Sequence, residues 1–269
     1  MALFLFSHIC ISELVLNKNN VMEQKQQFPT EEVTLPSKGL LYPEDSPLRS
    51  GVIEMKYMTA KEEDILTNQN LISNGTVIDK LLQSLIVTPI KFNDLLIGDK
   101  NAILVAARIL GYGKDYVFEY NNEQITVDLT SIEDKVLDES LIIDGKNNFE
   151  FTLPSSELNI TFKFLTHGDE QKISREIQGL KKLNKASSNE GTTRMKYTIT
   201  SINGEYDDKK IRKFVDNELL AIDARALRNH IKSIQPDANL KFNYEDNRGR
   251  IKEINIPIGL GFFWPDVEL

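Results

Sequence analysis

The chain has 269 residues, of which 41% are hydrophobic and 27% are charged, and its formal net charge is −8. These values are ordinary for a soluble protein with one large or two average domains. The acidic balance argues against a general nucleic-acid binder, because contacts to phosphates need clustered Lys and Arg. The single cysteine, Cys10, excludes an internal disulfide and a cysteine metal cage, and fits a cytosolic setting.

Residues 1–21 differ in character from the rest of the chain. Their apolar run is interrupted by polar residues, so it is too short and too polar to span a bilayer. It also lacks the basic start and the small-residue cleavage site of a signal peptide. We therefore expect Met22 to begin the functional chain, with residues 1–21 being dispensable or translated from an upstream start.

The stretch 33–66 reads as a short extended segment, a loop rich in Gly and Pro, a strand over 52–58 and the start of a helix. Thr59 is predicted to be the helix N-cap, with Glu62 three residues later. This is the pattern of a capping box, with carboxylates at the positive end of the helix dipole.

The same plan recurs over residues 151–173, with a strand at 160–165 followed by Thr166 and Asp169 as the second capping pair. Further along, DLLIGD at 94–99 is echoed by ELLAID at 218–223. We therefore predict an α+β fold of two tandem copies, residues 22–145 and 146–269, each a strand, a helix cluster and a β-hairpin. Chance recurrence of short patterns is the alternative. The sequence does not decide between a pseudo-twofold pair and separate beads.

The spacing of apolar residues predicts the remaining elements. Asp99 is expected to cap the second of two helical pieces, at 92–97 and 101–110. Alternation around Asn121 and Asn122 predicts a hairpin over 116–129. The other expected elements are helices at 62–69, 77–86, 131–138 and 169–184, two helical runs within 208–234, a loop at 185–193, a strand at 194–202 and a hairpin at 240–258.

No catalytic motif stands out. The three histidines are not paired at a metal spacing, and His167, in the first turn of a helix, is expected to be solvated or to cap that helix. Two clusters of apolar and aromatic residues, at 40–42 and 262–264, are candidates for anchoring a partner protein. The alternative is that they pack inside the core. The candidate anchor residues are Leu40, Leu41, Tyr42, Phe262, Phe263 and Trp264.

Two long segments carry a family resemblance: LPSKGLLYPEDSPLRSGVIEMKYMTAKEEDILTNQNLISNGTVIDKLLQSLI, from Leu35, and DLLIGDKNAILVAARILGYG after it. They closely resemble the baseplate hub and hub assembly proteins of T-even-type contractile-tailed phages. The resemblance extends, more weakly, to the closing FFWPD.

Relatives of this type carry a Cys-x-x-Cys in each hairpin, which resembles a paired zinc knuckle. This chain departs from that pattern at both hairpins, with Tyr120 and Glu123 in the first and Tyr244 and Asn247 in the second. Two ligands are only half of a tetrahedral site and bind zinc poorly. If the two hairpins share one zinc site, both are therefore expected to lose their cysteines together. We therefore expect no zinc or other cofactor, and hairpins held by side-chain packing.

The resemblance implies a non-enzymatic protein of baseplate hub assembly, which binds other baseplate or hub proteins in the host cytoplasm. It is either a transient assembly factor or a structural subunit that remains in the virion tail baseplate. Self-association is a further option, whereas no nucleic acid or membrane is expected as a partner. The alternative function is a cell-wall-degrading tail hydrolase, which needs two carboxylates facing one cleft. A DNA-contacting role is a third, and the acidic charge argues against it.

Overall fold

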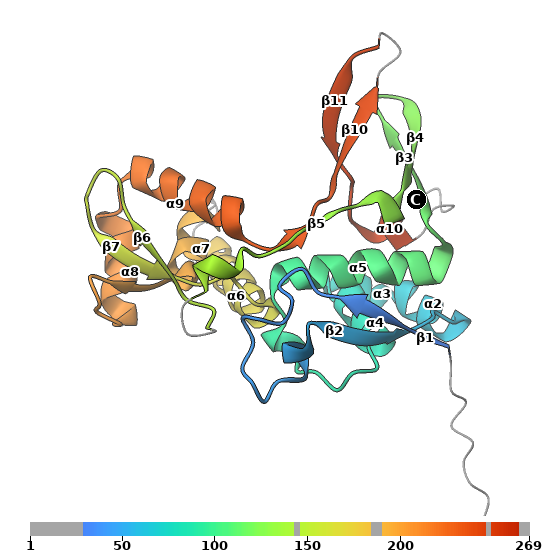
Figure 1. The fold of residues 1–269 in the computed structure, drawn as a ribbon, viewed down its shortest axis with the longest axis horizontal. Coiled ribbons are helices and arrows are strands. Elements are labelled where there is room, and N and C mark those ends of the chain that lie inside the picture. The colour runs from blue at the N-terminus through green and yellow to red at the C-terminus, as the bar shows by residue number, and fades with distance from the viewer. Residues whose placement is uncertain (1–28, 143–145, 184–189, 246–248, 264–269) are drawn as a thin grey trace, which may run out of the picture.

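The computed structural model describes residues 29–142, 146–183, 190–245 and 249–263 (Figure 1). The fold is mixed α+β, as expected, and its strands form several small antiparallel sheets. Within the described residues, the largest sheet has three strands, in the order β6-β7-β8. The core therefore lies mainly between helices and hairpins.

The first half of the chain contains two hairpin-like strand pairs with helices between them. Its elements are β1 (Thr30–Thr34), η1 (Pro47–Ser50), β2 (Val52–Lys56), α2 (Ala60–Leu66), α3 (Gln69–Ser73), α4 (Val77–Leu85), η2 (Phe92–Asp94), α5 (Ile97–Tyr112), β3 (Asp115–Tyr120), β4 (Glu123–Asp128), η3 (Leu129–Ser131), β5 (Asp134–Lys135) and η4 (Glu139–Leu141).

The second half begins with a strand pair and ends with a hairpin and a short helix, with further helices between them. Its elements are β6 (Phe149–Thr152), β7 (Asn159–Phe162), α6 (His167–Leu183), α7 (Glu190–Thr198), β8 (Ile199–Ile202), α8 (Asp208–Asn217), α9 (Ala221–Ile234), β9 (Asp237–Ala238), β10 (Lys241–Glu245), β11 (Ile251–Asn255) and α10 (Leu260–Phe263).

Local chemistry explains several of these elements. The predicted hairpin turn is confirmed, because Asn121 and Asn122 both have positive φ, at 52° and 64°, between the paired strands β3 and β4. In the loop between β1 and β2, Gly39 has φ of 74°, and a Cβ there would lie 2.5 Å from the carbonyl oxygen of Arg49. Only glycine fits that close approach.

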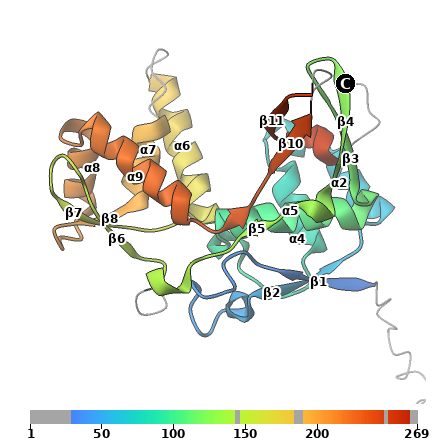
Figure 2. The same cartoon turned by 45° about the horizontal axis from the view of Figure 1, so that its top comes forward.

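The elements gather into two groups, which we call lobes (Figures 1 and 2). The second lobe consists of β6, β7, β8 and α6–α9. The first lobe consists of β1, β2, α2–α5, β3 and β4, and it also receives β10, β11 and α10 from the end of the chain. The β10–β11 hairpin thus lies beside the β3–β4 hairpin in the first lobe, although it belongs in sequence to the second half of the chain.

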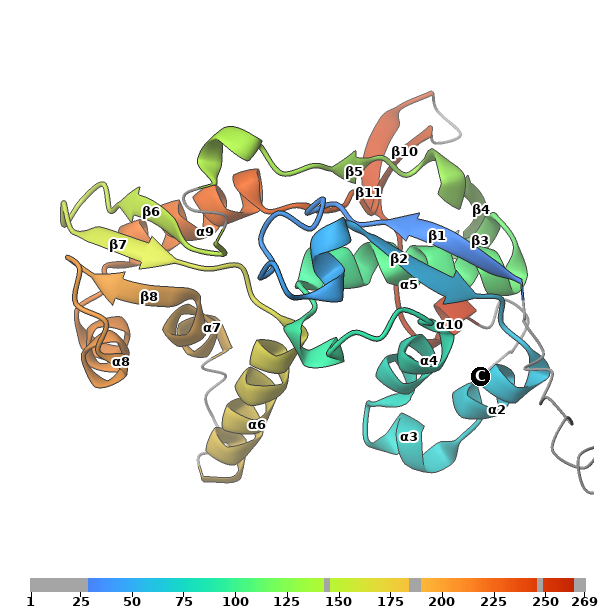
Figure 3. The ribbon, with the colours of Figure 1, turned by 60° about the horizontal axis from the view of Figure 1, so that its bottom comes forward.

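Two crossing segments tie the lobes together along one side of the molecule (Figure 3). β5 pairs antiparallel with β9, with Asp134 opposite Ala238 and Lys135 opposite Asp237. β9 also runs closely over the start of α5: a Cβ on Gly98 would lie only 1.9 Å from the carbonyl oxygen of Pro236. Gly98 is therefore required for this crossing.

The C-terminal aromatic residues fill the core of the first lobe. Phe262 and Phe263 are buried, and the Phe262 ring packs edge-on against the Tyr116 ring, with centroids 4.8 Å apart. The Tyr116 hydroxyl donates to the carbonyl of Pro257 at 3.2 Å. These contacts fix the end of the chain on α5 and β3.

Several predicted elements differ from the observed ones. Residues 131–138 hold no α-helix, because Asp134 and Lys135 pair as a strand with distant β9. The second helical piece begins at Ile97 and not after Asp99, and residues 92–94 form only a short 3-10 turn. Residues 194–198 continue α7, which also covers 190–193 of the expected loop, so only 199–202 form a strand.

The described residues contain no helix that is both long and apolar enough to cross a membrane.

Candidate functional site

A buried carboxylate, Asp99, fastens the loop after β1 to the first turn of α5. Its oxygens accept hydrogen bonds from the backbone N–H of Ser37 at 2.9 Å, the Ser37 hydroxyl at 2.7 Å and the Tyr42 hydroxyl at 2.6 Å. The Tyr42 oxygen in turn accepts from the N–H of Leu96 at 2.9 Å. Asp99 was expected to cap the helix, but it lies inside α5, and its partners come from a distant loop.

Burial shifts the pKa of both Asp99 and Tyr42. Burial raises the pKa of Asp99, while the hydrogen bonds from Ser37 and Tyr42 act in the opposite direction. Burial and the neighbouring carboxylate of Asp99 also raise the pKa of Tyr42, so its hydroxyl remains a donor at any physiological pH.

The second half has a matching contact. Asp223, fully buried in the first turn of α9, accepts from the backbone N–H groups of Ser155 at 2.8 Å and Ser156 at 3.1 Å. In both halves an aspartate in the helix that follows a Leu-Leu pair therefore holds the loop that carries a Leu-Pro-Ser sequence. The similarity of DLLIGD and ELLAID was the sequence signal for this contact.

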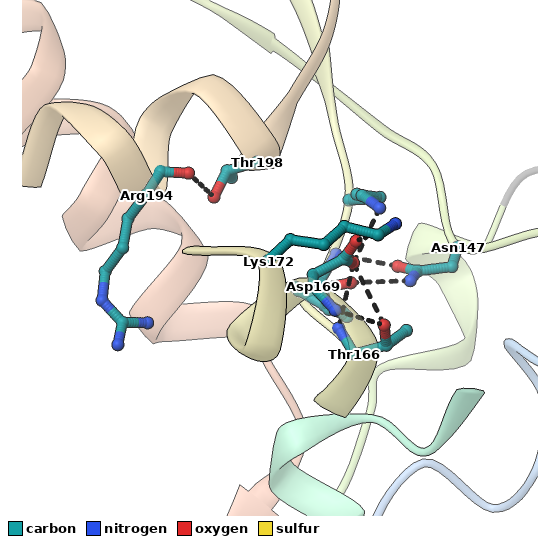
Figure 4. Close-up of polar contacts among 8 residues, drawn as sticks. Asn147, Thr166, Asp169, Lys172, Arg194 and Thr198 are labelled. Carbon is teal, nitrogen blue, oxygen red and sulfur yellow. Dashed lines mark hydrogen bonds and ion pairs between the residues drawn. The ribbon is translucent and has the colours of Figure 1, made fainter. Parts of the chain in front are cut away.

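Both predicted capping pairs are confirmed. The Glu62 carboxylate accepts from the backbone N–H of Thr59 at 3.0 Å and from the Lys56 ammonium at 2.7 Å. In the second half, Asp169 accepts from the N–H of Thr166 at 3.2 Å, and its own N–H donates to the Thr166 hydroxyl (Figure 4).

Burial alone would raise the pKa of Glu62, but the hydrogen bonds from Lys56 and Thr59 outweigh it and lower the pKa. Lys163 occupies the place of Lys56 in the second half, 2.7 Å from Asp169. Asn147 sits beside this cap and exchanges two hydrogen bonds, each 2.8 Å long, with the backbone of Phe164.

The lobes meet where the segment before α5 pairs with the segment before α6. The His167 N–H donates to the carbonyl of Leu95 at 2.8 Å, and the Ile97 N–H donates to the carbonyl of Leu165 at 3.1 Å. Leu96 and Thr166 face each other in this antiparallel bridge. Leu95 and Leu96 are both buried as a result.

His167 reinforces this junction and is buried, which corrects the expectation of a solvated or capping histidine. The Lys100 ammonium lies 3.2 Å from its Nδ1, and the Asp79 carboxylate lies 3.4 Å from its Nε2. An ammonium only donates, so Nδ1 accepts from Lys100, while Nε2 also lies 2.9 Å from the side-chain amide nitrogen of Gln171. Burial and the charge of Lys100 lower the pKa of His167, while Asp79 and Glu170 act in the opposite direction.

Beside the junction lies an open groove with a volume of about 730 Å³. Its polar lining comes from both halves of the chain, and the residues concerned are Tyr42, Glu44, Arg49, Asp94, Lys146, Asn147 and Thr166. Both signs of charge are present, so the groove suits a polar segment of a partner better than a purely anionic or cationic ligand.

The predicted partner anchors are largely used inside the molecule. Leu41, Tyr42, Phe262 and Phe263 are buried, and Leu40 is half-buried. A buried side chain cannot anchor a partner while the fold is intact, so the alternative of core packing holds for these four. Tyr42 and Leu41 still line part of the groove. Trp264 lies outside the described residues.

The two hairpins bring their knuckle positions together. The rings of Tyr120 and Tyr244 pack edge-on with centroids 6.2 Å apart, and Glu123 is paired opposite Tyr120 across the first hairpin. Asn247 lies outside the described residues. In the described parts of the chain, no group of three or more His, Cys, Asp or Glu side chains is arranged to hold a metal ion.

Comparisons of the chain with protein families, with curated proteins and with solved structures found no match.

Sequence reasoning missed the charged group of Asp79, Lys100 and His167, because these residues belong to three different helices. No pattern along the chain pairs them. It also missed the role of Tyr42 as both donor to Asp99 and acceptor from Leu96.

Proposed function

We propose that this chain is a non-enzymatic protein of contractile phage tail baseplate hub assembly that works by binding other hub subunits. The observation that carries the proposal is the close resemblance of the stretch from Leu35 to Ile86 to hub proteins of T-even-type phages. This stretch builds the loop, strand and helices of the first lobe, and its Tyr42 reaches the junction and the groove. The most family-like part of the chain is thus the part that shapes the candidate binding surface.

We further propose that the two halves are copies of one unit. Three matched contacts support this: the buried aspartates Asp99 and Asp223, the capping pairs at Thr59 and Thr166, and the lysines beside those caps. Each contact joins the same kinds of element in the same order. Chance recurrence of a single local pattern would not reproduce a contact between residues more than sixty positions apart.

The use of the polar groups supports binding over catalysis. Asp99, Asp223, Glu62 and Asp169 all accept several hydrogen bonds from the fold itself. A general acid or base must instead face its substrate. In the proposed role, a hub partner would be recognised through the groove and through strand edges.

The test uses tagged protein beginning at Met22, expressed in phage-infected host cells. Hub proteins recovered with the bait, combined with its absence from purified particles, would identify an assembly factor of the host cytoplasm. A fixed small number of copies in purified particles would identify a resident tail subunit. Recovery of no tail protein would contradict the proposal.

The alternative of a cell-wall hydrolase has one place to be tested. Glu44 and Asp94 are the two carboxylates in the lining of the groove. Purified protein should leave host cell walls intact if the binding role is correct. Lysis by the wild type that is lost in E44Q and in D94N would support the hydrolase.

A further inference from the structure

The contact between the lobes joins two different surfaces. One surface is the segment before α5, Leu95–Ile97, and the other is the segment before α6, Leu165–His167. If the halves correspond, each surface has a counterpart in the opposite half. The counterpart of Leu95–Ile97 is Leu219–Ala221, before α9, and the counterpart of Leu165–His167 is Met58–Ala60, before α2.

Met58 and Leu219 are half-buried against the core, but Ala60, Leu220 and Ala221 are exposed. Leu220 is 47% exposed, whereas the matching Leu96 is 3% exposed. Throughout the described residues, the carbonyls of Met58 and Leu219 and the N–H groups of Ala60 and Ala221 make no backbone hydrogen bond. The matching groups at the junction make two such bonds. Next to Leu220, Ile222 is 62% exposed.

The two uncovered surfaces cannot meet within one molecule. The segment before α9 belongs to the second lobe, and α2 lies at the far side of the first lobe (Figure 1). A contact between two unlike surfaces leaves one surface of each kind free at the ends, which is the arrangement that extends head to tail.

We propose that a second copy of this chain covers these surfaces, with Leu219–Ala221 of one molecule pairing with Met58–Ala60 of the next. The pairing would reproduce the backbone bridge of the junction and bury Leu220. The inference rests on the correspondence between the halves and does not depend on a role in phage assembly.

The contact between copies is expected to be weaker than the junction. Ala60 stands where the second half has His167, and Ala224 stands where the first half has Lys100, so the charged group of the junction has no equivalent. Lys61 also replaces Gly168, which at the junction lies close to the backbone of Asn93. The association should therefore become visible only at higher protein concentrations than a contact with the full charged group would need.

The experiment is sedimentation velocity on the full chain over a concentration series. Wild-type protein should shift from the 30.7 kDa monomer towards multiples of that mass as the concentration rises. L220E should remain monomeric because it places a charge in the contact. A60P should also remain monomeric because proline lacks the N–H, although proline is well tolerated at the first position of a helix. I251E is the matched control: it adds the same charge at a side chain that is 74% exposed elsewhere, and it should associate like the wild type.

Mixing the variants tests the head-to-tail geometry. L220E retains an intact Met58–Ala60 surface, and A60P retains an intact Leu219–Ala221 surface. An equimolar mixture should therefore form dimers that grow no further. Wild type that stays monomeric throughout, association unchanged in L220E and A60P, or a mixture that forms no dimer would each overturn the proposal. Thermal unfolding of each variant checks that it is folded.

Discussion

Three donors from one loop converge on the buried carboxylate of Asp99, and the Tyr42 hydroxyl both donates to that carboxylate and accepts from Leu96. A buried polar atom that loses its partner keeps the cost of its desolvation. A single oxygen atom in Tyr42 therefore stabilises two segments at once.

We expect Tyr42→Phe to lower the free energy of unfolding by about 1–3 kcal/mol, because it leaves the Leu96 N–H without its acceptor and removes one donor from Asp99. Chemical denaturation measures the change. Tyr206→Phe is the control: its side chain is 71% exposed, so the change should stay within about 0.5 kcal/mol. Equal effects of the two substitutions would contradict the role of Tyr42.

His167 gives stability a dependence on pH. Because its pKa is lowered in the folded protein, the unfolded chain takes up a proton first as the pH falls. The junction is therefore fully stable above the ordinary histidine pKa of about 6.5 and loses stability below it. The Tm should fall between pH 7.5 and pH 5.5, and His167→Gln should flatten that fall.

His230 is the control for this measurement. Burial also lowers its pKa, but it stacks on Phe151 and is not part of the charged group at the junction. His230→Gln should therefore retain the part of the pH dependence that His167 causes. A pH profile unchanged by His167→Gln would show that other groups dominate.

At the scale of elements, β9 and the residue before it run closely over the start of α5. Gly98→Ala would place a Cβ 1.9 Å from the carbonyl oxygen of Pro236, so the crossing strand must move. We expect a loss of about 1–3 kcal/mol or more, the usual range for overpacking, by thermal or chemical unfolding.

Gly179→Ala is the matched control, because a Cβ at this position of α6 has nothing within 4 Å. Alanine is the better helix former, so this variant should gain up to about 1 kcal/mol. A Gly98→Ala variant as stable as the control would mean that β9 does not press on α5.

The elements that the sequence predicts well are those whose causes lie within a few residues. Thr59 and Glu62, like Thr166 and Asp169, interact across three positions, and the turn at Asn121 depends on that residue and its neighbour. The acidic residue at position 99 looks like a cap by the same local criterion.

The remaining elements depend on contacts that sequence patterns do not contain. Asp99 binds a loop around position 37, and Asp134 is a strand residue only because β9 lies beside it. For the candidate site, the two capping pairs could be predicted, whereas the groove and the charged group around His167 could not. They form only after the lobes have met.

For the whole molecule, the C-terminal hairpin belongs in sequence to the second half and in space to the first lobe. The Tyr120 and Tyr244 rings are one link between them, and both side chains are half-buried. In a double-mutant cycle, Tyr120→Ala and Tyr244→Ala should couple by about 0.5–1.5 kcal/mol, as aromatic pairs do. Additive effects would mean that the hairpins stand side by side without supporting each other.

The position of Phe262 and Phe263 in the core of the first lobe also affects how the protein is made. The ribosome releases α2–α5 and the first hairpin early, but the aromatic rings that complete their core are translated only after β6–β11. Until then the nascent first lobe exposes apolar surface to chaperones and proteases. A stop codon introduced between β11 and Phe262 should therefore remove the protein from the cell, and not merely shorten it.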